Sequence, residues 1–447
     1  MSASRITKLM ALLTVCSAPW AQPARGVCVG GEGCFTSIQE AVNAAQPSDV
    51  ISIRPGTYHE QIDVPLVKTG ITLAGSASKP AAVVIDCSNF AQGDAVVVSA
   101  PGVTLRDFLV RRSPGNGITF KATASHSRVA NVQLVSPAHD GIAIDAEDVL
   151  VERNKVIASG NNGIDVKAAR AVIRDSTVSG SHGICIQIQG DSAAISDNTI
   201  FGSKSGACIQ AVGDNVHVDH NRIKSCAGRG IEVRGDAPLV KGNTVSDSQA
   251  EGVRVDCGRN GTCTRGLVSS NVVRDIAENA CFDLSAATAG LIARDNSAMH
   301  CGAAGFLISG AGLRLEGNES SDNGLYKTSA GFAVDGTLHS LAKNMASKNS
   351  GDGFVLRGAG HVLELNWAQG NRGNGYNVKL RETAGAKLSK NAAADNALVG
   401  FAVRTGTVNA ALSGNISTGN GTDYCDAGSG TTETQDAFGT IGGCRHD

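Results

Sequence analysis

The chain has 447 residues, enough for two or three ordinary domains or one long repeat array. Glycine contributes 55 residues and aromatic residues only 4%, a composition typical of many tight turns around a core of small aliphatic side chains. The formal net charge is −2, so no overall field favours nucleic acid or an anionic membrane. We therefore expect no nucleic-acid partner.

Residues 1–24 are typical of a signal peptide for export. Arg5 and Lys8 stand beside the apolar stretch LMALLTVCSA (9–18), which is too short to span a bilayer. The alternative is a lipoprotein signal with the lipid on Cys16. No other segment is long and apolar enough to span a membrane, so we expect a secreted or periplasmic protein without a transmembrane segment.

The remainder, 25–447, is predicted to form one domain with a cap at each end. The stretch SIQEAVNAAQ (37–46) predicts an amphipathic helix, within an N-terminal cap at about 35–47. Ser37 and Glu40 have the spacing of a capping box at the start of that helix. The C-terminal end, about 421–447, is polar and irregular and is predicted to be the second cap.

A repeated pattern fills most of the chain. An Asn followed by aliphatic and polar residues, and then Gly-aliphatic-x-aliphatic as in GIDV (163–166), recurs at steps of 22 to 28 residues. Glycine and β-branched residues at every turn disfavour a helical repeat. We predict an all-β fold, a single-stranded right-handed parallel β-helix of roughly 12–15 coils. The recurrent Asn would form a hydrogen-bonded ladder at one turn. These residues are Asn154, Asn198, Asn221, Asn243, Asn271, Asn296, Asn318, Asn344, Asn366, Asn391 and Asn415.

Twelve of the 13 cysteines follow the signal segment, and an even number in an exported chain predicts disulfides. The local pairs expected are Cys28–Cys34, Cys257–Cys263 and Cys425–Cys444. Cys185 and Cys208 take the same place in neighbouring repeats, where strands about 4.8 Å apart allow a further bridge. Free thiols and a metal site are the alternatives for that pair. The sequence assigns no partner to Cys87, Cys226, Cys281 and Cys301.

One segment resembles a known superfamily. FTSIQEAVNAAQPSDVISIRPGTYHEQIDV (35–64), followed by GITLAGS (70–76), resembles the opening of the pectin-lyase-like β-helix superfamily. That group includes pectin methylesterases, pectate lyases, polygalacturonases and NosD-type periplasmic proteins. The resemblance covers about 35–420 and implies the β-helix fold. It does not specify the activity, because the methylesterase signature has no match here.

Polygalacturonases are the sharper comparison within that superfamily. Their motifs align with AHDGI (138–142), GNNGI (160–164), SHGICI (181–186) and NRIKS (221–225). The resemblance implies roles in the site for Asp140, His182, Arg222 and Lys224. Asn161 and Asn162 replace the paired aspartates that include the general acid of that family, which argues against hydrolysis by that route.

Aligning the coils on the turn glycine predicts a polar strip on one sheet, across about 139–256. Residues two and four positions after that glycine point outward, which places Gln187 and Gln210 four positions after Gly183 and Gly206. Later coils present small or apolar residues such as Leu307 and Val355. A strip across stacked coils offers successive subsites to a polysaccharide. Solvated ion pairs between neighbouring strands are the purely structural interpretation. The predicted contacts are His139, Asn161, Asn162, Gln187, Gln210, Arg222, Lys224 and Glu232.

Two reactions fit such a strip. In β-elimination, Lys167, Arg234 or Arg254 would take the proton beside a uronate carboxylate, which a second cation or Ca²⁺ neutralises. Asp145, Asp165 and Asp256 could supply Ca²⁺ ligands. In hydrolysis, Asp140 and Asp165 would be the two carboxylates, with His182 as a further catalytic candidate.

We therefore predict binding and processing of an acidic polysaccharide, with β-elimination favoured over hydrolysis. The alternatives are a non-catalytic carbohydrate-binding or surface-binding protein and a NosD-like maturation factor. Sugar binding without turnover favours exposed aromatic residues, and Trp367 is the single tryptophan outside the signal segment.

Overall fold

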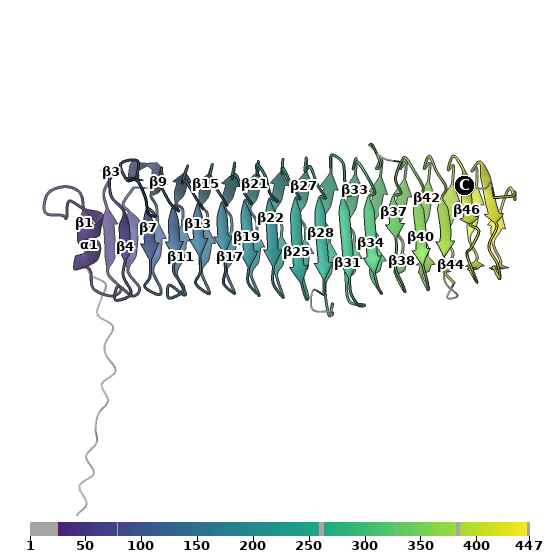
Figure 1. Cartoon of the computed structure of the whole chain (residues 1–447), viewed down its shortest axis with the longest axis horizontal. Coiled ribbons are helices and arrows are strands. Elements are labelled where there is room, and N and C mark those ends of the chain that lie inside the picture. Colours follow the sequence, from purple (N-terminus) through teal and green to yellow (C-terminus); the bar gives the residue numbers. More distant parts are fainter. Residues whose placement is uncertain (1–25, 78, 259–262, 327, 381–384, 445–447) are drawn as a thin grey trace, which may run out of the picture.

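A computed structural model describes residues 26–444, except 78, 259–262, 327 and 381–384. The predicted signal peptide, 1–24, lies outside the described residues. Three parallel sheets wind together in a right-handed β-helix along one long axis (Figure 1). Within the described ranges, no helix has the length and apolar character needed to cross a membrane.

Each complete coil contributes one strand to each sheet, in the chain order A, B, C. Sheet A has 18 strands: β1 (Gly26–Val29), β2 (Val50–Ile53), β5 (Thr72–Gly75), β8 (Thr104–Arg106), β11 (Arg128–Ala130), β14 (Leu150–Glu152), β17 (Val172–Arg174), β20 (Ala194–Ser196), β23 (His217–Asp219), β26 (Leu239–Lys241), β29 (Leu267–Ser269), β32 (Ile292–Arg294), β35 (Arg314–Glu316), β38 (Ser340–Ala342), β41 (Val362–Glu364), β44 (Lys387–Ser389), β47 (Ala411–Ser413) and β50 (Thr432–Thr434).

Sheet B follows sheet A in each coil. Its strands are β3 (Gly56–Tyr58), β6 (Val83–Asp86), β9 (Leu109–Arg111), β12 (Gln133–Val135), β15 (Lys155–Ile157), β18 (Thr177–Ser179), β21 (Thr199–Phe201), β24 (Arg222–Lys224), β27 (Thr244–Ser246), β30 (Val272–Arg274), β33 (Ser297–Met299), β36 (Glu319–Ser321), β39 (Met345–Ser347), β42 (Trp367–Gln369), β45 (Ala392–Ala394), β48 (Ile416–Thr418) and β51 (Ala437–Phe438). A short 3-10 helix, η1 (Pro80–Ala82), precedes β6.

Sheet C closes the coil. It has 16 strands: β4 (Ile62–Val64), β7 (Val96–Val98), β10 (Ile118–Phe120), β13 (Ile142–Ile144), β16 (Ile164–Val166), β19 (Ile186–Gln189), β22 (Ile209–Val212), β25 (Ile231–Gly235), β28 (Val253–Cys257), β31 (Phe282–Ala286), β34 (Phe306–Gly310), β37 (Phe332–Val334), β40 (Phe354–Gly358), β43 (Tyr376–Leu380), β46 (Val399–Val403) and β49 (Thr422–Asp426). The sheets hold more strands than the roughly 12–15 coils predicted, because the early coils lack the Asn that marks the period.

The predicted Asn ladder is present at the turn from sheet A to sheet B. Both the backbone N–H and the Nδ2 of Asn198 donate to Oδ1 of Asn221, at 3.0 Å each. Asn221 makes the same pair of bonds to Asn243. The residue before each Asn has a left-handed backbone, as at Asp197 with φ 57°. Each amide thus satisfies the backbone of a turn that has no strand partner of its own.

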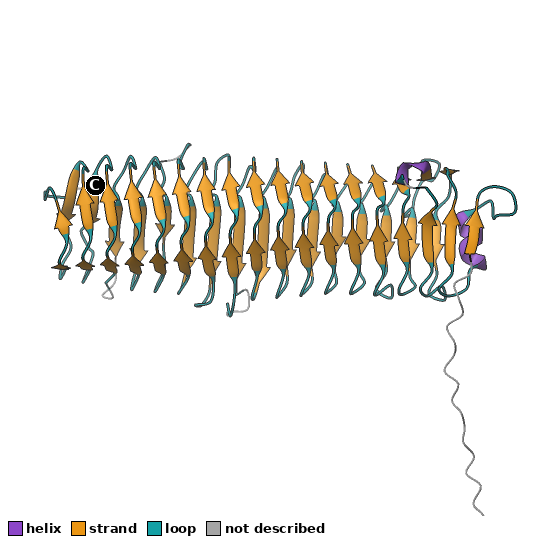
Figure 2. Ribbon diagram, turned by 180° about the vertical axis from the view of Figure 1, so that it is seen from behind, coloured by secondary structure: helices purple, strands orange, loops and turns teal. Residues whose placement is uncertain are grey.

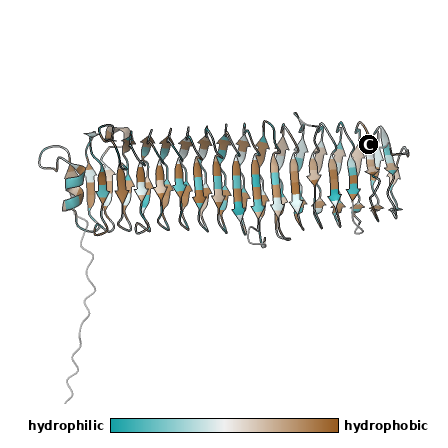
Figure 3. Cartoon of the chain, in the orientation of Figure 1, coloured by the Kyte–Doolittle hydropathy of each residue, from teal (hydrophilic) through white to brown (hydrophobic). Residues whose placement is uncertain are grey.

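The interior changes character along the axis. Side chains in the early coils are mainly aliphatic, with Phe108 and Phe120 also buried, and Figure 3 shows hydrophobic residues repeating along the strands. From β31 onward, aromatic rings stack from coil to coil, beginning with Phe282 and Phe306 at 4.7 Å between centroids. The stack continues to Tyr376 and Phe401, at 4.5 Å. Larger rings at one inward position therefore replace the Ile and Val of the earlier coils.

The N-terminal helix α1 (Ile38–Ala44) lies at one end of the cylinder (Figure 2). Its buried face includes Ile38 and Val42, which covers the first coil as a cap must. Ser37 Oγ accepts the N–H of Glu40 at 3.3 Å, one half of the predicted capping box. Glu60 accepts the N–H of Ile38 at 2.9 Å, so a carboxylate from the first coil also stabilises the helix start.

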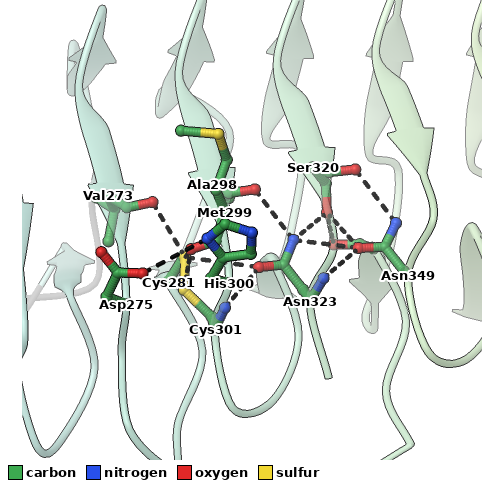
Figure 4. The surroundings of a disulfide bond; sticks show 11 residues. Val273, Asp275, Cys281, Ala298, Met299, His300, Cys301, Ser320, Asn323 and Asn349 are labelled. Atoms are coloured by element: carbon green, nitrogen blue, oxygen red, sulfur yellow. Dashed lines mark hydrogen bonds and ion pairs between the residues drawn. A yellow bond between two sulfur atoms is a disulfide. The ribbon is translucent and has the colours of Figure 1, made fainter. Parts of the chain in front are cut away.

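Five disulfides join described cysteines. Three of them, Cys28–Cys34, Cys257–Cys263 and Cys425–Cys444, confirm the sequence prediction. The other two are Cys208–Cys226 and Cys281–Cys301, and Figure 4 shows the second beside Asn323.

The predicted bridge between Cys185 and Cys208 is wrong. Both residues occupy the inward turn-glycine position, since Cys185 lies opposite Gly163 in the register. From this position Cys208 reaches Cys226, two residues after a sheet B strand. The corresponding residue for Cys185 is Ser203, two residues after β21. Cys185 therefore stays a buried free thiol, as does Cys87.

Candidate functional site

The register of sheet C defines a column of outward side chains that crosses the strands. The sequence alignment placed Gln187 and Gln210 in a second outward column, and this was wrong by two residues. The error arose because Gly183 and Gly206 were taken as the turn glycines of their coils. The corrected column is Thr119, Ala143, Asp165, Gln187, Gln210, Glu232, Arg254, Asp283, Leu307, Ala333, Val355 and Asn377.

Asp140 belongs to a hydrogen-bond ladder in the turn before sheet C. Its N–H donates to Asn116 Oδ1 at 3.0 Å. Its Oδ1 accepts the N–H of Asn162 and the Nδ2 of Asn161, both at 2.9 Å. Burial raises the pKa of Asp140 despite these hydrogen bonds. The structure therefore brings the predicted catalytic carboxylate of Asp140 together with Asn161 and Asn162. Its hydrogen bonds there stabilise the turns of neighbouring coils.

Asp165 and Lys167 form a partly buried ion pair on β16 and the residue that follows it. Lys167 Nζ lies 3.2 Å from Asp165 Oδ2, while Asp165 Oδ1 is buried without a hydrogen-bond partner. The adjacent Asp165 carboxylate raises the pKa of Lys167. This environment stabilises the charged ammonium, which opposes the role of Lys167 as a proton acceptor.

Glu232 is the centre of an ionic network on β25. Its Oε2 accepts Gln210 Nε2 at 2.8 Å, and its Oε1 lies 2.6 Å from Arg234 and 3.4 Å from Arg229. Burial opposes ionisation, yet Gln210 and the guanidiniums lower the pKa of Glu232. Arg234 is thus held by a carboxylate of its own chain.

The network continues on the next two coils. Arg229 Nε donates to Glu251 at 2.8 Å, and Arg254 Nε lies 3.6 Å from Asp283 Oδ2. Burial raises the pKa of Asp283 although Arg254 opposes this effect. These contacts match the structural interpretation of the strip, in which acids and bases on neighbouring strands pair with each other.

Other predicted residues lie apart from this network. Arg222 and Lys224 are exposed on β24 in sheet B, so the structure does not bring them to the outward face of sheet C. His182 lies in the turn before β19, with Nδ1 3.2 Å from Ser159 O and Nε2 3.4 Å from Lys204 Nζ. His139 is exposed in the turn before β13.

The predicted calcium ligands Asp145 and Asp256 cannot share one ion. They lie in one outward column but are separated by five coil steps, or about 24 Å at the usual strand spacing. Asp256 instead accepts a hydrogen bond from Ser285 at 3.1 Å. Among described residues, no group of three His, Cys, Asp or Glu side chains could hold a metal ion.

Two grooves follow the outward face of sheet C. The first, here called the N-terminal groove, has a volume of about 1200 Å³. It contains four of the predicted residues, Asp145, Lys167, Gln210 and Arg234. Its floor is formed by small residues at the ends of the strands, among them Gly190 and Gly213. The strip predicted across about 139–256 is therefore partly a groove.

The second, the C-terminal groove, has a volume of about 680 Å³ and was not predicted. It exists because one position, the residue just before the turn glycine, is Ala in three successive coils, at Ala280, Ala304 and Ala330. The preceding coils have Arg229 and Glu251 at this position, where they form the ion pair described above. The lost side-chain volume opens the face of the sheet.

The floor of the C-terminal groove is apolar and its walls are polar. Leu307, Ala333 and Val355 supply the floor together with the three alanines. At one end, Asp352 Oδ2 accepts Asn377 Nδ2 at 2.7 Å, and Asn377 Oδ1 accepts Arg404 Nε at 3.2 Å. Apolar floors with a few oriented polar groups are typical of ligand sites.

Basic residues outnumber acidic residues along this groove. The acids are Glu251 and Asp352. The bases are Arg357, Arg372, Lys379 and Arg404. Arg357 and Lys379 are register partners on β40 and β43, so neighbouring coils present two cations side by side. The sequence signal was available in Leu307 and Val355, which were predicted to be outward and apolar but were not connected with this basic column.

Comparisons with known proteins agree with the fold. A family model described as "Right handed beta helix region" matches residues 162–320. A second, "Periplasmic copper-binding protein (NosD)", matches residues 51–206. The search of curated proteins gave no match. The chain has the right-handed parallel β-helix fold that the sequence predicted.

Three solved structures illustrate the similarity in shape, each at a TM-score below 0.5. The A-module of mannuronan C-5 epimerase AlgE4 from Azotobacter vinelandii is 12% identical, covering 78% of this chain and 93% of its own, with a TM-score of 0.43. An alginate lyase from Paenibacillus sp. str. FPU-7 is 16% identical over 52% and 91%, with a TM-score of 0.39. The Agl-KA catalytic domain is 14% identical over 81% and 69%, with a TM-score of 0.44.

The residues matched by the NosD model do not fit a copper site. Copper in proteins prefers Cys, Met and His ligands. The segment 51–206 has no Met, and its described cysteines, Cys87 and Cys185, are buried apart from each other. Its histidines lie on different coils and form no described group of three ligands with other side chains. We therefore derive no chemistry through copper.

Proposed function

We propose that this protein binds an acidic polysaccharide along the outward face of sheet C, with the C-terminal groove as the main site. The observation that carries the proposal is the pairing of an apolar floor with walls in which four bases outnumber two acids. An apolar floor accepts the C–H face of a pyranose ring, and guanidinium and ammonium groups pair with uronate carboxylates.

The shape of the groove supports a linear ligand. Its lining runs from Glu251 to Leu398 across seven coils, which is about 29 Å at the usual spacing of strands. The column at Arg357 and Lys379 follows the same axis. A chain of sugars lying across the strands would therefore meet the same kind of contact at each coil.

The N-terminal groove is less suited to an anionic chain. Its lining contains four acids and two bases, and those bases, Lys167 and Arg234, already pair with Asp165 and Glu232. A polyanion there would have to compete with carboxylates of the protein itself. We therefore propose that the polar strip mainly stabilises the fold through its ion pairs. It extends the binding face but contributes little to the choice of ligand.

Export belongs to the same proposal. The five disulfides among described residues are typical of an oxidising compartment. We propose that the chain acts outside the cytoplasm, in the periplasm or beyond, where acidic polysaccharides are met.

Cleavage by β-elimination is the second candidate, and one observation favours it. Arg357 and Lys379 are register partners, so their backbones lie about 4.8 Å apart. Arg357 could neutralise the uronate carboxylate while Lys379, as a neutral amine, accepts the proton on the neighbouring carbon. The Lys379 ammonium or water then gives a proton to the leaving sugar oxygen. The elimination then breaks the glycosidic bond and leaves a double bond in the new chain end. This moves the proposed centre away from Lys167, Arg234 and Arg254.

The test is binding and product analysis with a panel of acidic and neutral polysaccharides, with and without Ca²⁺. We expect the oxidised mature protein to bind acidic chains, more weakly as salt increases. Arg357→Ala should weaken binding about tenfold through the lost charge-assisted hydrogen bond. Arg294→Ala, an exposed cation on β32 in sheet A, is the matched control and should bind like the wild type.

The outcomes separate the two candidates. Fragments lighter by one water than hydrolysis products mean β-elimination, and no fragments with retained affinity mean binding alone. Equal affinity for neutral chains, or an equal loss in the Arg294→Ala control, would contradict the proposed site. No binding to any member of the panel would favour a maturation or surface role instead.

A further inference from the structure

One connection beside the C-terminal groove is longer than its neighbours. Ten residues, 322–331, join β36 to β37, whereas six residues join the corresponding strands one coil earlier (300–305) and one coil later (348–353). Thr328 and Ser329 of this connection line the groove. Thr328 and Ser329 therefore lie at the rim of the groove, where the three alanines open it.

The connection presents two large side chains to solvent at this rim. Leu325 is 60% exposed and Tyr326 is 72% exposed. Their backbone N–H groups donate to Cys301 O at 3.2 Å and Gly302 O at 3.1 Å. The next residue of that neighbouring coil, Ala303, lines the groove. The backbone at Tyr326 is thus held beside the groove while its side chain is largely exposed.

Exposure of this ring has no explanation in the packing. All four tyrosines of the chain lie in the described residues. Tyr376 and Tyr424 are buried, and the hydroxyl of Tyr58 donates to Arg54 O at 2.8 Å. Tyr326 alone among them is largely exposed. Tyr326 is also adjacent in the chain to the exposed Leu325, and neighbouring exposed apolar groups, unlike scattered single ones, mark a contact surface.

We propose that Tyr326, supported by Leu325, is a stacking platform that binds the apolar face of a sugar ring at the rim of the C-terminal groove. This inference rests on the proposed function. The cations of the groove would hold the carboxylate of one uronate, and the Tyr326 ring would hold the plane of a neighbouring sugar. Tyrosine suits this role because its large flat surface carries few rotatable bonds.

The first test compares the affinity of three variants for the polysaccharide that the wild type binds best. Tyr326→Ala should bind about tenfold more weakly, and Tyr326→Phe should stay within about twofold, since the ring face and not the hydroxyl makes the contact. Trp367→Ala is the matched control, because Trp367 is 49% exposed on β42 in sheet B. Its affinity should equal that of the wild type.

A second readout reports on the ring itself. Nitration by tetranitromethane should modify Tyr326 before the other tyrosines, and a saturating concentration of the polysaccharide should slow this modification several-fold. A merely structural role for Tyr326 would not produce ligand-dependent protection.

The outcomes distinguish the inference from the proposed function. One set of results would contradict the stacking platform alone. In it, the wild type binds acidic chains and Arg357→Ala weakens that binding, but Tyr326→Ala binds as tightly as the Trp367→Ala control and the polysaccharide does not slow nitration. The C-terminal groove would then remain the binding site. If the wild type binds no polysaccharide, the proposed function and the platform are overturned together.

Discussion

The two grooves of sheet C arise from one repeat and differ in what their side chains already do. In the N-terminal groove, Asp191 Oδ1 accepts the N–H of Asp214 at 2.8 Å, and Asp214 Oδ1 accepts the N–H of Asp236 at 2.7 Å. Two of its four acids thus accept backbone N–H groups of the next coil. In the C-terminal groove, three alanines at one position leave the floor bare. In this repeat, mixed charges at one position therefore pair with each other and stabilise the fold. A run of small side chains at one position instead leaves space for a ligand.

This difference follows from the geometry of a stack of coils. Equivalent positions of neighbouring coils lie about 4.8 Å apart. Opposite charges or amides at one such position can therefore form ion pairs or hydrogen bonds with each other. A run of small residues has no such partner. Because the coils on either side keep Arg229 with Glu251 and Asp352 with Asn374, the run is closed at both ends.

The largest effect on polysaccharide binding is expected from filling the C-terminal groove with an ion pair like that of the earlier coils. Ala304→Arg combined with Ala330→Glu would recreate at the floor the ion pair that Arg229 and Glu251 form in earlier coils. The net charge of the chain stays constant, and neighbouring coils show that the position accepts these side chains. We expect polysaccharide binding to weaken more than about 100-fold, because the filled floor excludes the ligand. Calorimetric titration measures this change.

The matched control places the same pair on another sheet. Ala392→Arg with Ile416→Glu changes two outward register partners of β45 and β48 in sheet B. This variant should bind like the wild type. An equal loss of binding in the control, or full binding by the groove variant, would mean that the C-terminal groove is not the site.

The acid response should also differ between the two halves. His339 and His361 stack inside the later coils at 5.2 Å between ring centroids. His339 Nδ1 accepts the N–H of Leu313 at 3.1 Å, and its Nε2 donates to Asp335 O at 3.0 Å. A proton on Nδ1 would face that N–H. Burial accordingly lowers the pKa of His339 to about 4.

The sign of the pH dependence follows from this shift. An unfolded chain binds a proton at His339 near the ordinary pKa of 6.5, whereas the folded chain resists it until about 4. Stability is therefore complete above pH 6.5 and falls as the pH decreases toward 4, by up to about 3 kcal/mol from this residue. Burial lowers the pKa of His361 as well.

Hydrogen exchange at pH 7 and pH 4.5 checks this prediction. The amides around Leu313 and His339 should lose protection at the lower pH more than those of the aliphatic coils near Val151. His339→Asn should reduce that loss, because an Asn amide can accept the same N–H as in the ladders. His300→Asn, at an exposed histidine beside Asp275, is the control. Uniform loss of protection along the whole helix would contradict the prediction.

The period of the sequence was sufficient to predict the fold. It was not sufficient to predict the register of the sheet C strands in two coils. Asn198 and Asn221 mark the turn that they occupy, so the ladder and the order of strands were predictable. Cys185 and Cys208 stand where other coils have the turn glycine, so the alignment slipped onto Gly183 and moved the outward columns by two. A one-residue or two-residue slip is costly because side chains alternate between faces.

The site was harder to predict because it depends on what is missing from neighbouring coils. Ala280, Ala304 and Ala330 carry no signal in a single repeat, and only their stacking in space makes a groove. A second Asn ladder, from Asn323 to Asn420 (Figure 4 shows its start), was likewise missed. Its residues follow sheet B strands in the later coils only, where they take the position that Ser248 and Cys301 have in earlier coils.

The smallest effect is expected from the pair that first suggested catalysis. Lys167→Gln leaves the buried carboxylate of Asp165 without its ammonium partner. Lys167 is more than half exposed, so solvent screens part of the loss, and we expect the free energy of unfolding to decrease by about 1–2 kcal/mol. Polysaccharide affinity should stay within about twofold of the wild type, because the pair supports β16 and does not contact the main site.

A double variant tests whether the pair acts as a structural unit. Lys167→Gln with Asp165→Asn removes both charges, and its midpoint in urea should return toward the wild type because no unpaired charge remains. If product formation were lost in Lys167→Gln while the midpoint did not change, Lys167 would act on the substrate. The reaction would then belong to the N-terminal groove, with binding and cleavage divided between the two regions of one sheet.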